Sequence, residues 1–207
     1  MQSVMFNQHK AYPSKIVCVG RNYLNHIKEL NNQVPEEPVL FIKPNSAINS
    51  ELIIPEGRAL HYEAELCLLI QNKKIIAAGV GLDLTDRCLQ TQLKEKGLPW
   101  EKAKAFDASA VFSEFSPLKS ESDLLNLSFS LSINGKLRQK GAYEDMIYKP
   151  QALLSHIAHY FTLADDDIVM TGTPEGVGEV SHGDAFEVTL YLNAKKLLQH
   201  QFIACKS

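Results

Sequence analysis

Apolar residues along the chain are grouped into short segments, which are separated by turn-forming glycine, proline, asparagine and aspartate residues. Many segments are rich in β-branched and aromatic residues, and several alternate apolar with polar positions, as half-buried strands do. The pattern predicts β-strands at residues 15–20, 39–43, 52–54, 61–70 and 74–84, and a further strand that opens the stretch 166–178.

The second half of the chain carries two hairpin signals. In residues 127–141 the pair Asn134-Gly135 lies between two β-prone arms, and this pair suits the two positive φ angles of a type I′ turn. Residues 184–204 predict a closing hairpin.

Helical patterns are limited to three segments. Residues 21–32 and 149–163 carry an apolar stripe, and residues 85–99 combine helix-forming content with a stop at glycine and proline. Many short strands with a few helices predict a mainly β, α+β fold. No repeat or linker divides the sequence, so we expect one domain over residues 1–207.

Composition excludes several classes of protein. Apolar residues make up 45% of the chain and charged residues 22%, as is ordinary for a globular protein. The formal net charge of −3 and the isoelectric point near 6.2 argue against nucleic acid as a partner. The lysine-rich stretches 94–96 and 102–104 are either local basic patches or, as the more common arrangement, solvated faces.

Targeting and cysteine signals are weak. No apolar run reaches the roughly 20 residues that cross a bilayer, so no membrane partner is expected. The N-terminal residues lack the apolar segment of a secretion signal. The cysteines at 18, 67, 88 and 205 have no CxxC spacing, which disfavours a zinc knuckle or a disulfide framework, and we expect a cytoplasmic protein.

Two glutamates, Glu63 and Glu65, stand two residues apart in the segment HYEAELCLLI. On a strand they share one face, so their like charges must be solvated, paired or neutralised by a cation. Asp83 ends the next predicted strand. A turn centred on Lys73 places Asp83 on the face of the two glutamates, whereas a two-residue turn at Asn72-Lys73 places it on the other face. The sequence leaves both registers open.

Three converging carboxylates would form an all-oxygen site. Such a site suits Mg²⁺ or Mn²⁺ rather than zinc, and leaves about three positions of an octahedron for water and substrate. The structural alternative is an exposed strand face beside an unrelated aspartate, which is the more common arrangement for an isolated pair of glutamates.

Other candidate residues lie outside this acidic set. His26 and Glu29 are i, i+3 on a predicted helix, where a carboxylate can orient an imidazole as a general base, although such pairs also occur on solvated helices. Arg21 and Lys104 are candidate anion contacts or plain surface residues. The loop TGTPEGVG, residues 171–178, either presents N–H groups to an anion or forms a sharp turn, and it matches neither the P-loop nor GxGxxG.

The order of several segments resembles the fumarylacetoacetate hydrolase family, and in particular its short branch of acylpyruvate hydrolases and oxaloacetate decarboxylases. The segments that carry the resemblance are VCVGRNYLNHIKEL, EPVLFIKP, HYEAEL, GLDLTDRCLQ, KGLPWEKAKAFDAS, INGKLRQ and MTGTPEGVG. The resemblance runs from about residue 15 to the C-terminus.

The resemblance implies a mixed β-roll of the type of the family's C-terminal catalytic domain, with a few peripheral helices, in a homodimer. It also implies roles for single residues. Glu63, Glu65 and Asp83 match the Mg²⁺ or Mn²⁺ ligands. The other matches are the water-activating dyad of His26 and Glu29, the lysine beside the metal at Lys104, the substrate-contacting Gln90 and Thr173, and the motif arginines Arg21 and Arg87.

The implied activity is metal-dependent hydrolysis of a C–C bond in 3-acylpyruvates, which are small 2-oxo acids, together with decarboxylation of oxaloacetate through the same pyruvate enolate. One alternative is an isomerase or hydratase of 2-oxo or 2-hydroxy dienoic acids on the same scaffold. Another is a metal-binding homologue without turnover.

Two departures from the family pattern stand out. The chain reads LTDRC where the family usually reads LTARD or similar, so Asp86 and Cys88 replace an alanine-like and an aspartate position. A helical insertion that is usual before the LD strand is absent, and only IQNKKIIAAGV, residues 70–80, fills this connection. We expect the short connection to keep Asp83 on the face of the glutamates, because the flanking motifs are intact.

Overall fold

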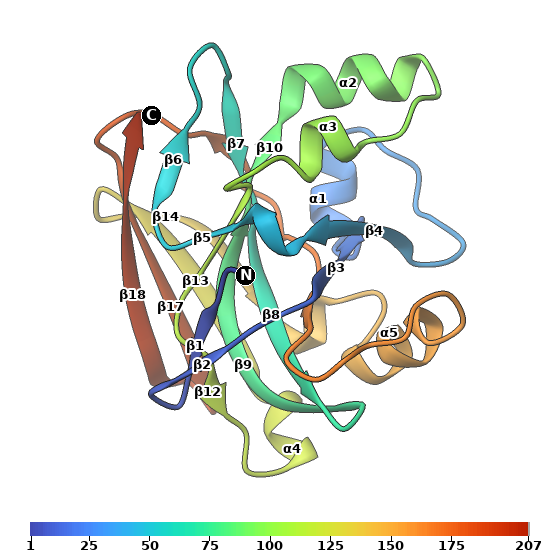
Figure 1. Ribbon diagram of the computed structural model, residues 1–207, viewed down its shortest axis with the longest axis vertical. Coiled ribbons are helices and arrows are strands. Elements are labelled where there is room, and N and C mark those ends of the chain that lie inside the picture. The colour runs from blue at the N-terminus through green and yellow to red at the C-terminus, as the bar shows by residue number, and fades with distance from the viewer. Residues whose placement is uncertain (207) are drawn as a thin grey trace.

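Strands predominate over helices in the computed structural model, which describes residues 1–206, and this confirms the mainly β architecture predicted from the sequence (Figure 1). The largest sheet has the strand order β4-β3-β15-β8-β9-β11-β5, with β12 paired to β9. Its strands are β3 (Lys15–Gly20), β4 (Val39–Pro44), β5 (Ile48–Asn49), β8 (Ala64–Gln71), β9 (Lys74–Asp83), β11 (Ala110–Phe112), β12 (Ser116–Pro117) and β15 (Ile168–Met170).

A second, five-stranded sheet has the order β14-β13-β17-β18-β6. Both predicted hairpins of the second half of the chain belong to it. Its strands are β6 (Leu52–Ile54), β13 (Leu127–Ile133), β14 (Lys136–Ala142), β17 (Ala185–Leu192) and β18 (Lys195–Lys206). Figure 1 shows these long strands on the side of the molecule opposite to helices α1 and α5.

Smaller elements complete the described chain. Strands β1 (Val4–Phe6) and β2 (His9–Ala11) form a hairpin, and β7 (Leu60–Tyr62) pairs with β10 (Thr85–Asp86) and β16 (Gly178–Glu179). The helices are α1 (Leu24–Glu29), α2 (Arg87–Glu95), α3 (Glu101–Lys104), α4 (Glu121–Leu124) and α5 (Pro150–Ile157), with short 3₁₀ turns at Asn45–Ala47 and Tyr143–Asp145. No helix among residues 1–206 is long and apolar enough to span a bilayer.

The main core lies between the two large sheets. Strand β13 alternates buried with half-buried residues, and its inward side chains pack against those of β8, β9 and β17. Phe129, Leu131, Phe186 and Val188 are fully buried there. One contiguous apolar cluster therefore joins both sheets.

The opposite face of the large sheet carries a second apolar cluster, which includes Cys18, Cys67 and Leu69 and is covered by the N-terminal hairpin and Phe115. Both buried cysteines are free, as predicted. Because strand side chains alternate, Glu65 lies on this same face of β8 as Cys67. The acidic residues therefore continue a buried face rather than an exposed one.

All three predicted helices are shorter than the sequence pattern indicated. The helix expected over 21–32 is confined to Leu24–Glu29, since Arg21 and Asn31 adopt positive φ angles that no helix accommodates. The helix expected over 149–163 ends at Ile157. The predicted strand 61–70 is interrupted at Glu63, which lies between β7 and β8.

Candidate active site

The position of Asp83 depends on the hairpin formed by β8 and β9. Its turn is the two-residue type at Asn72-Lys73, both with positive φ, which alone would put Asp83 on the wrong face. Leu69 pairs with Ala77 and Ile70 with Ile75, so Ile76 is an extra residue in a β-bulge. The bulge shifts the register by one residue and restores Asp83 to the face of Glu63 and Glu65. The bulge therefore places Asp83 on the face where we expected it, and the sequence did not predict this bulge.

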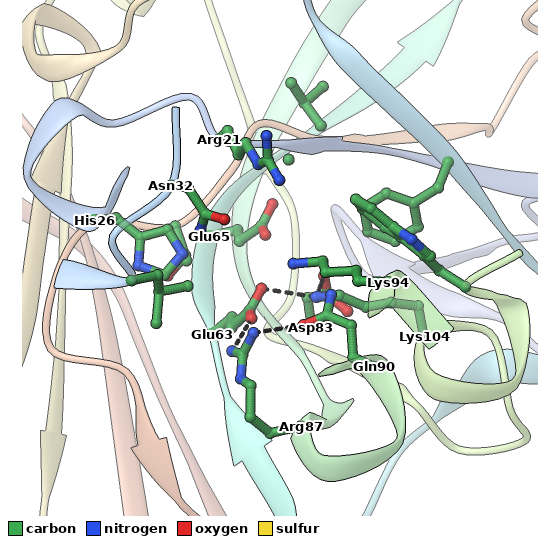
Figure 2. A pocket seen from close by; sticks show the side chains of 16 residues that line it. Arg21, His26, Asn32, Glu63, Glu65, Asp83, Arg87, Gln90, Lys94 and Lys104 are labelled. Carbon is green, nitrogen blue, oxygen red and sulfur yellow. Dashed lines mark hydrogen bonds and ion pairs between the residues drawn. The ribbon is translucent and has the colours of Figure 1, made fainter. Parts of the chain in front are cut away.

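One pocket collects nine of the ten predicted site residues (Figure 2). The acidic residues come from the junction of β7 and β8, from the start of β8 and from the end of β9. The others come from the segment after β3, from helices α1, α2 and α3, and from the loop after β15. The predicted residues that line it are Arg21, His26, Glu63, Glu65, Asp83, Arg87, Gln90, Lys104 and Thr173. Glu29 reaches the pocket only through its contact with His26.

Lys104 is the centre of a buried ionic network. Its ammonium donates to Glu63 Oε2 at 2.8 Å, to Asp83 Oδ2 at 2.6 Å and to Thr85 Oγ1 at 2.7 Å. Burial alone would lower the pKa of Lys104, but the carboxylates of Asp83 and Glu63 outweigh it and hold that pKa above its ordinary value. Lys104 therefore remains a cation at neutral pH.

A second buried lysine, Lys43, contacts this network through the Asp83 carboxylate and the Lys104 carbonyl. Its ammonium lies 2.9 Å from Asp83 Oδ1 and donates to the Ser109 carbonyl and hydroxyl, each at 2.9 Å, and to the Lys104 carbonyl. These bonds join β4, the end of β9 and the last turn of α3, and so fix where the Lys104 side chain begins.

Helix α2 presents Arg87 and Gln90 to the acidic residues. Arg87 pairs with Glu63 and also donates to Gln90 Oε1 at 2.7 Å. The substituted segment LTDRC supports this helix, because Asp86 caps it by accepting from the Leu89 amide at 3.0 Å. Cys88 is exposed and takes no part in the site. Neither Asp86 nor Cys88 makes a side-chain hydrogen bond to the carboxylates of Glu63, Glu65 or Asp83.

Glu65 and Thr173 are held by the loop after β15. The Gly172 amide donates to Glu65 Oε2 at 2.7 Å, and the Thr173 hydroxyl donates to the Ala64 carbonyl at 2.8 Å. Gln139 of β14 bridges the same groups, since it accepts from the Ala64 amide at 2.9 Å and donates to Thr173 Oγ1 at 2.8 Å. The loop 171–178 therefore orients a carboxylate of the acidic cluster.

His26 and Glu29 form a pair across one turn of α1. His26 Nδ1 lies 3.2 Å from Glu29 Oε2, and the other carboxylate oxygen accepts from the Gly176 amide at 3.0 Å. Glu29 is thus fixed at both oxygens, and it orients the imidazole so that the second ring nitrogen is left for the pocket, into which His26 faces (Figure 2).

The two glutamates have opposite electrostatic environments. Burial would raise the pKa of Glu63, but the charges of Lys104 and Arg87 hold it far below its ordinary value. Burial, together with the charges of Asp83 and Glu63, raises the pKa of Glu65 well above its ordinary value. Additional positive charge close to Glu65 would therefore favour the ionised form of this carboxylate.

The donor chemistry of this cluster fits a divalent cation. One oxygen from each of Glu63, Glu65 and Asp83 lies within 4.8 Å of the others, and all three residues are buried. Asp83 Oδ1 is buried and lies 2.9 Å from the Lys43 ammonium. Three carboxylates with no sulfur or imidazole match the preference of Mg²⁺ and Mn²⁺ for oxygen.

Sequence reasoning missed Lys94, Gln139 and Lys43 as site residues. Lys94 was interpreted as part of a solvated face, but it lines the pocket, because its position on α2 follows Gln90 by one turn. That i, i+4 spacing was a usable signal. Gln139 and Lys43 act through contacts between distant segments, which no local pattern reports.

Comparison with known proteins gives a consistent result. The family model described as "Fumarylacetoacetate (FAA) hydrolase C-terminal" matches residues 15–202. The chain is 47% identical over 195 residues to oxaloacetate tautomerase YcgM of Escherichia coli, covering 86% of this chain and 89% of that protein. It is 38% identical over 192 residues to the mitochondrial oxaloacetate tautomerase FAHD1 of Homo sapiens, covering 85% and 86%.

A solved structure extends the likeness to the fold. The chain matches fumarylpyruvate hydrolase from Pseudomonas aeruginosa, in complex with Mn²⁺ and pyruvate, with a TM-score of 0.88 and 28% identity. The match covers 100% of this chain and 96% of that one. The predicted family fold is therefore confirmed.

Proposed function

The chain belongs to the fumarylacetoacetate hydrolase family, and from this premise we propose that it catalyses the keto–enol tautomerisation of a small 2-oxo dicarboxylic acid of the oxaloacetate type. Two curated relatives that carry the name oxaloacetate tautomerase cover most of the chain, and one of them is 47% identical to it. The observation that carries the proposal is the meeting, in one pocket, of an oriented imidazole, a permanently charged lysine and three carboxylates.

Glu63, Glu65 and Asp83 would hold Mg²⁺ or Mn²⁺ in this proposal. When bound, the cation would supply Lewis-acid stabilisation of negative charge on the 2-oxo oxygen of the substrate. Lys104 contributes further positive charge from a fixed position, since it is tied to two of these carboxylates and to Thr85.

His26 is the proposed proton carrier. Conversion of the keto form to the enol requires that a proton leaves C3 and that a proton joins the 2-oxo oxygen, so no atom or electron is lost. Lys104 is held as a cation and cannot accept the proton. The imidazole of His26, fixed by Glu29, can take it and return it, and this is a general acid–base role.

Hydrolysis of 3-acylpyruvates is the second candidate, and the same His26–Glu29 pair favours it. In that reaction the imidazole would take a proton from water rather than from C3, and the C–C bond would break to give pyruvate and an acid. Decarboxylation of oxaloacetate would release pyruvate and carbon dioxide.

The proposed homodimer and cytoplasmic location also stay predictions. Light scattering on purified protein tests whether the chain forms a homodimer.

The test uses purified protein with Mg²⁺, with Mn²⁺ and with a chelator. We expect metal-dependent loss of the ultraviolet absorbance of enol oxaloacetate, with deuterium entering C3 in heavy water and with no matching release of pyruvate. His26→Asn is expected to lower the rate at least 100-fold, because general acid–base catalysis contributes about 10²–10⁴-fold. His182→Asn, at an exposed turn, is the matched control and is expected to stay within about twofold.

Two results would contradict the proposal. Release of pyruvate and acetate from acetylpyruvate, without faster tautomerisation of oxaloacetate, would replace the proposal by the hydrolase. Equal rates for His26→Asn and the wild type would remove His26 from the reaction.

A further inference from the structure

Lys94 lies in the pocket without a carboxylate partner. Its side chain extends from α2 into the pocket, and its ammonium lies 4.9 Å from the centre of the Trp100 ring (Figure 2). Among residues 1–206 the ion pairs within 4.0 Å include Lys15, Lys43, Arg87 and Lys104, but not Lys94. A half-buried cation over an aromatic ring and without a counter-ion is prepared for an anion from outside the chain.

Arg21 is a second cation in the same condition. It lines the pocket, its side chain points inward, and within the described chain no carboxylate pairs with it (Figure 2). Its backbone has a φ of 58°. That left-handed conformation costs an ordinary residue about 1 kcal/mol, and such strain often occurs at binding sites.

The charges that line the pocket are not balanced. Four cationic side chains, Arg21, Arg87, Lys94 and Lys104, face three carboxylates. A divalent cation at the carboxylates would add two further positive charges. The pocket therefore favours a ligand with more than one negative charge.

The electrostatic state of Lys94 agrees with this excess. Burial, together with the charges of Arg21 and Arg87, lowers the pKa of Lys94 to about 8. Burial and the neighbouring positive charges thus disfavour the charged form of Lys94, and an anion beside its ammonium would favour that form.

We propose that Lys94, assisted by Arg21, binds the distal carboxylate of the substrate and makes the site selective for dianionic over monoanionic 2-oxo acids; this inference rests on the proposed function. The acidic cluster then serves the end of the substrate that carries the C1 carboxylate and the 2-oxo group. Lys94, which lies beside Trp100, distinguishes substrates that carry a second carboxylate from substrates that do not.

The kinetic test compares oxaloacetate with its 4-ethyl ester, which keeps the C1 carboxylate and the 2-oxo group but lacks the distal charge. Lys94→Met is expected to lower kcat/KM for oxaloacetate about 10- to 100-fold more than for the ester, mainly through KM, as loss of a charged hydrogen bond does. Lys94→Arg is expected to retain most of the preference. Lys96→Met, at the exposed position directly after the last residue of α2, is the matched control.

A binding measurement separates this inference from the proposed function. Calorimetry with Mn²⁺-loaded protein would compare malate with lactate, which lacks the distal carboxylate. If the wild type does not turn over oxaloacetate, the proposed function fails, yet a loss of malate binding in Lys94→Met with lactate binding retained still supports the subsite. An unchanged oxaloacetate-to-ester ratio, or equal losses of malate and lactate, overturns it. Should Lys94→Met not fold, Lys94→Gln takes its place.

Discussion

At the scale of the residue, Gln139 connects the two halves of the pocket wall. It is buried and bonded to Ala64, Thr173 and the Pro174 carbonyl, so it ties β14 to the start of β8 and to the loop that orients Glu65. Gln139→Met keeps the volume but leaves buried polar groups unsatisfied, and we expect a loss of about 2 kcal/mol in the free energy of unfolding. Urea unfolding measures it.

Gln201→Met is the matched control for this prediction, because Gln201 is exposed on β18. It is expected to change the free energy of unfolding by less than about 0.5 kcal/mol. If the two variants unfolded at the same urea concentration, the bridge would have no energetic importance.

Candidate site residues were easier to find in the sequence than the residues that hold them in place. Glu63, Glu65 and Asp83 belong to recognisable segments, and the structure brings them together. Gln139 and Lys43 look like ordinary polar positions in strands. Their importance arises from partners 75 and 61 residues away, and the sequence does not state such pairings.

At the scale of the element, a repeated hairpin design sets the register of three strand pairs. Each has a two-residue turn that begins with asparagine, at Asn72-Lys73, Asn134-Gly135 and Asn193-Ala194, and both residues of each turn have positive φ. Each also has a bulge close to the turn, with Ile76, Arg138 or Leu197 as the extra residue. The turn chemistry is visible in the sequence, whereas the bulge depends on packing against the rest of the sheet.

Deletion of Ile76 tests the bulge in the β8–β9 hairpin. Without the extra residue the pairs Ile70–Ile75 and Leu69–Ala77 follow each other in a regular ladder, so Asp83 would keep its place opposite Glu63. We expect the deletion to cost about 1–3 kcal/mol through loss of the bulge and of the Ile76 side chain, and any rise in Tm on addition of Mg²⁺ or Mn²⁺ to be retained. Thermal unfolding with and without metal measures both effects.

Ile76→Ala is the control, since it keeps the extra residue and removes only a half-buried side chain. It is expected to cost about 1–2 kcal/mol and to retain the response to metal. A deletion variant that lost the metal response would show that the shortened strand pairs in another register and that Asp83 leaves the cluster.

At the scale of the whole molecule, the fold class followed from the sequence because many short β-prone segments can bury their apolar faces only in packed sheets. The strand order did not follow. Strand β15 lies between β3 and β8, which are distant from it in sequence, and the N-terminal hairpin covers the second apolar cluster. Long-range pairings of this kind depend on the sum of many contacts rather than on any local pattern.

Asp167 joins the segment before β3 to the segment before β15, and the direction in which its contribution to stability changes with pH can be predicted. Its carboxylate is buried and accepts from the Ser14 and Lys15 amides at 2.9 and 3.1 Å and from the Ala164 amide at 2.8 Å, and it pairs with the Lys15 ammonium. Burial would raise the pKa of Asp167, but the hydrogen bonds from Lys15 and Ser14 outweigh it and lower that pKa below its ordinary value.

A folded-state pKa below the unfolded value means that this stabilisation is complete above about pH 4 and is lost as the pH falls through the folded pKa. Asp167→Asn is therefore expected to destabilise the protein by about 1–3 kcal/mol at pH 7, and the difference from the wild type is expected to shrink toward pH 3. Asp107→Asn, at an exposed position, serves as the control in urea unfolding at both pH values. A destabilisation that did not depend on pH would assign the effect to packing of the β3 and β15 segments rather than to the charge of Asp167.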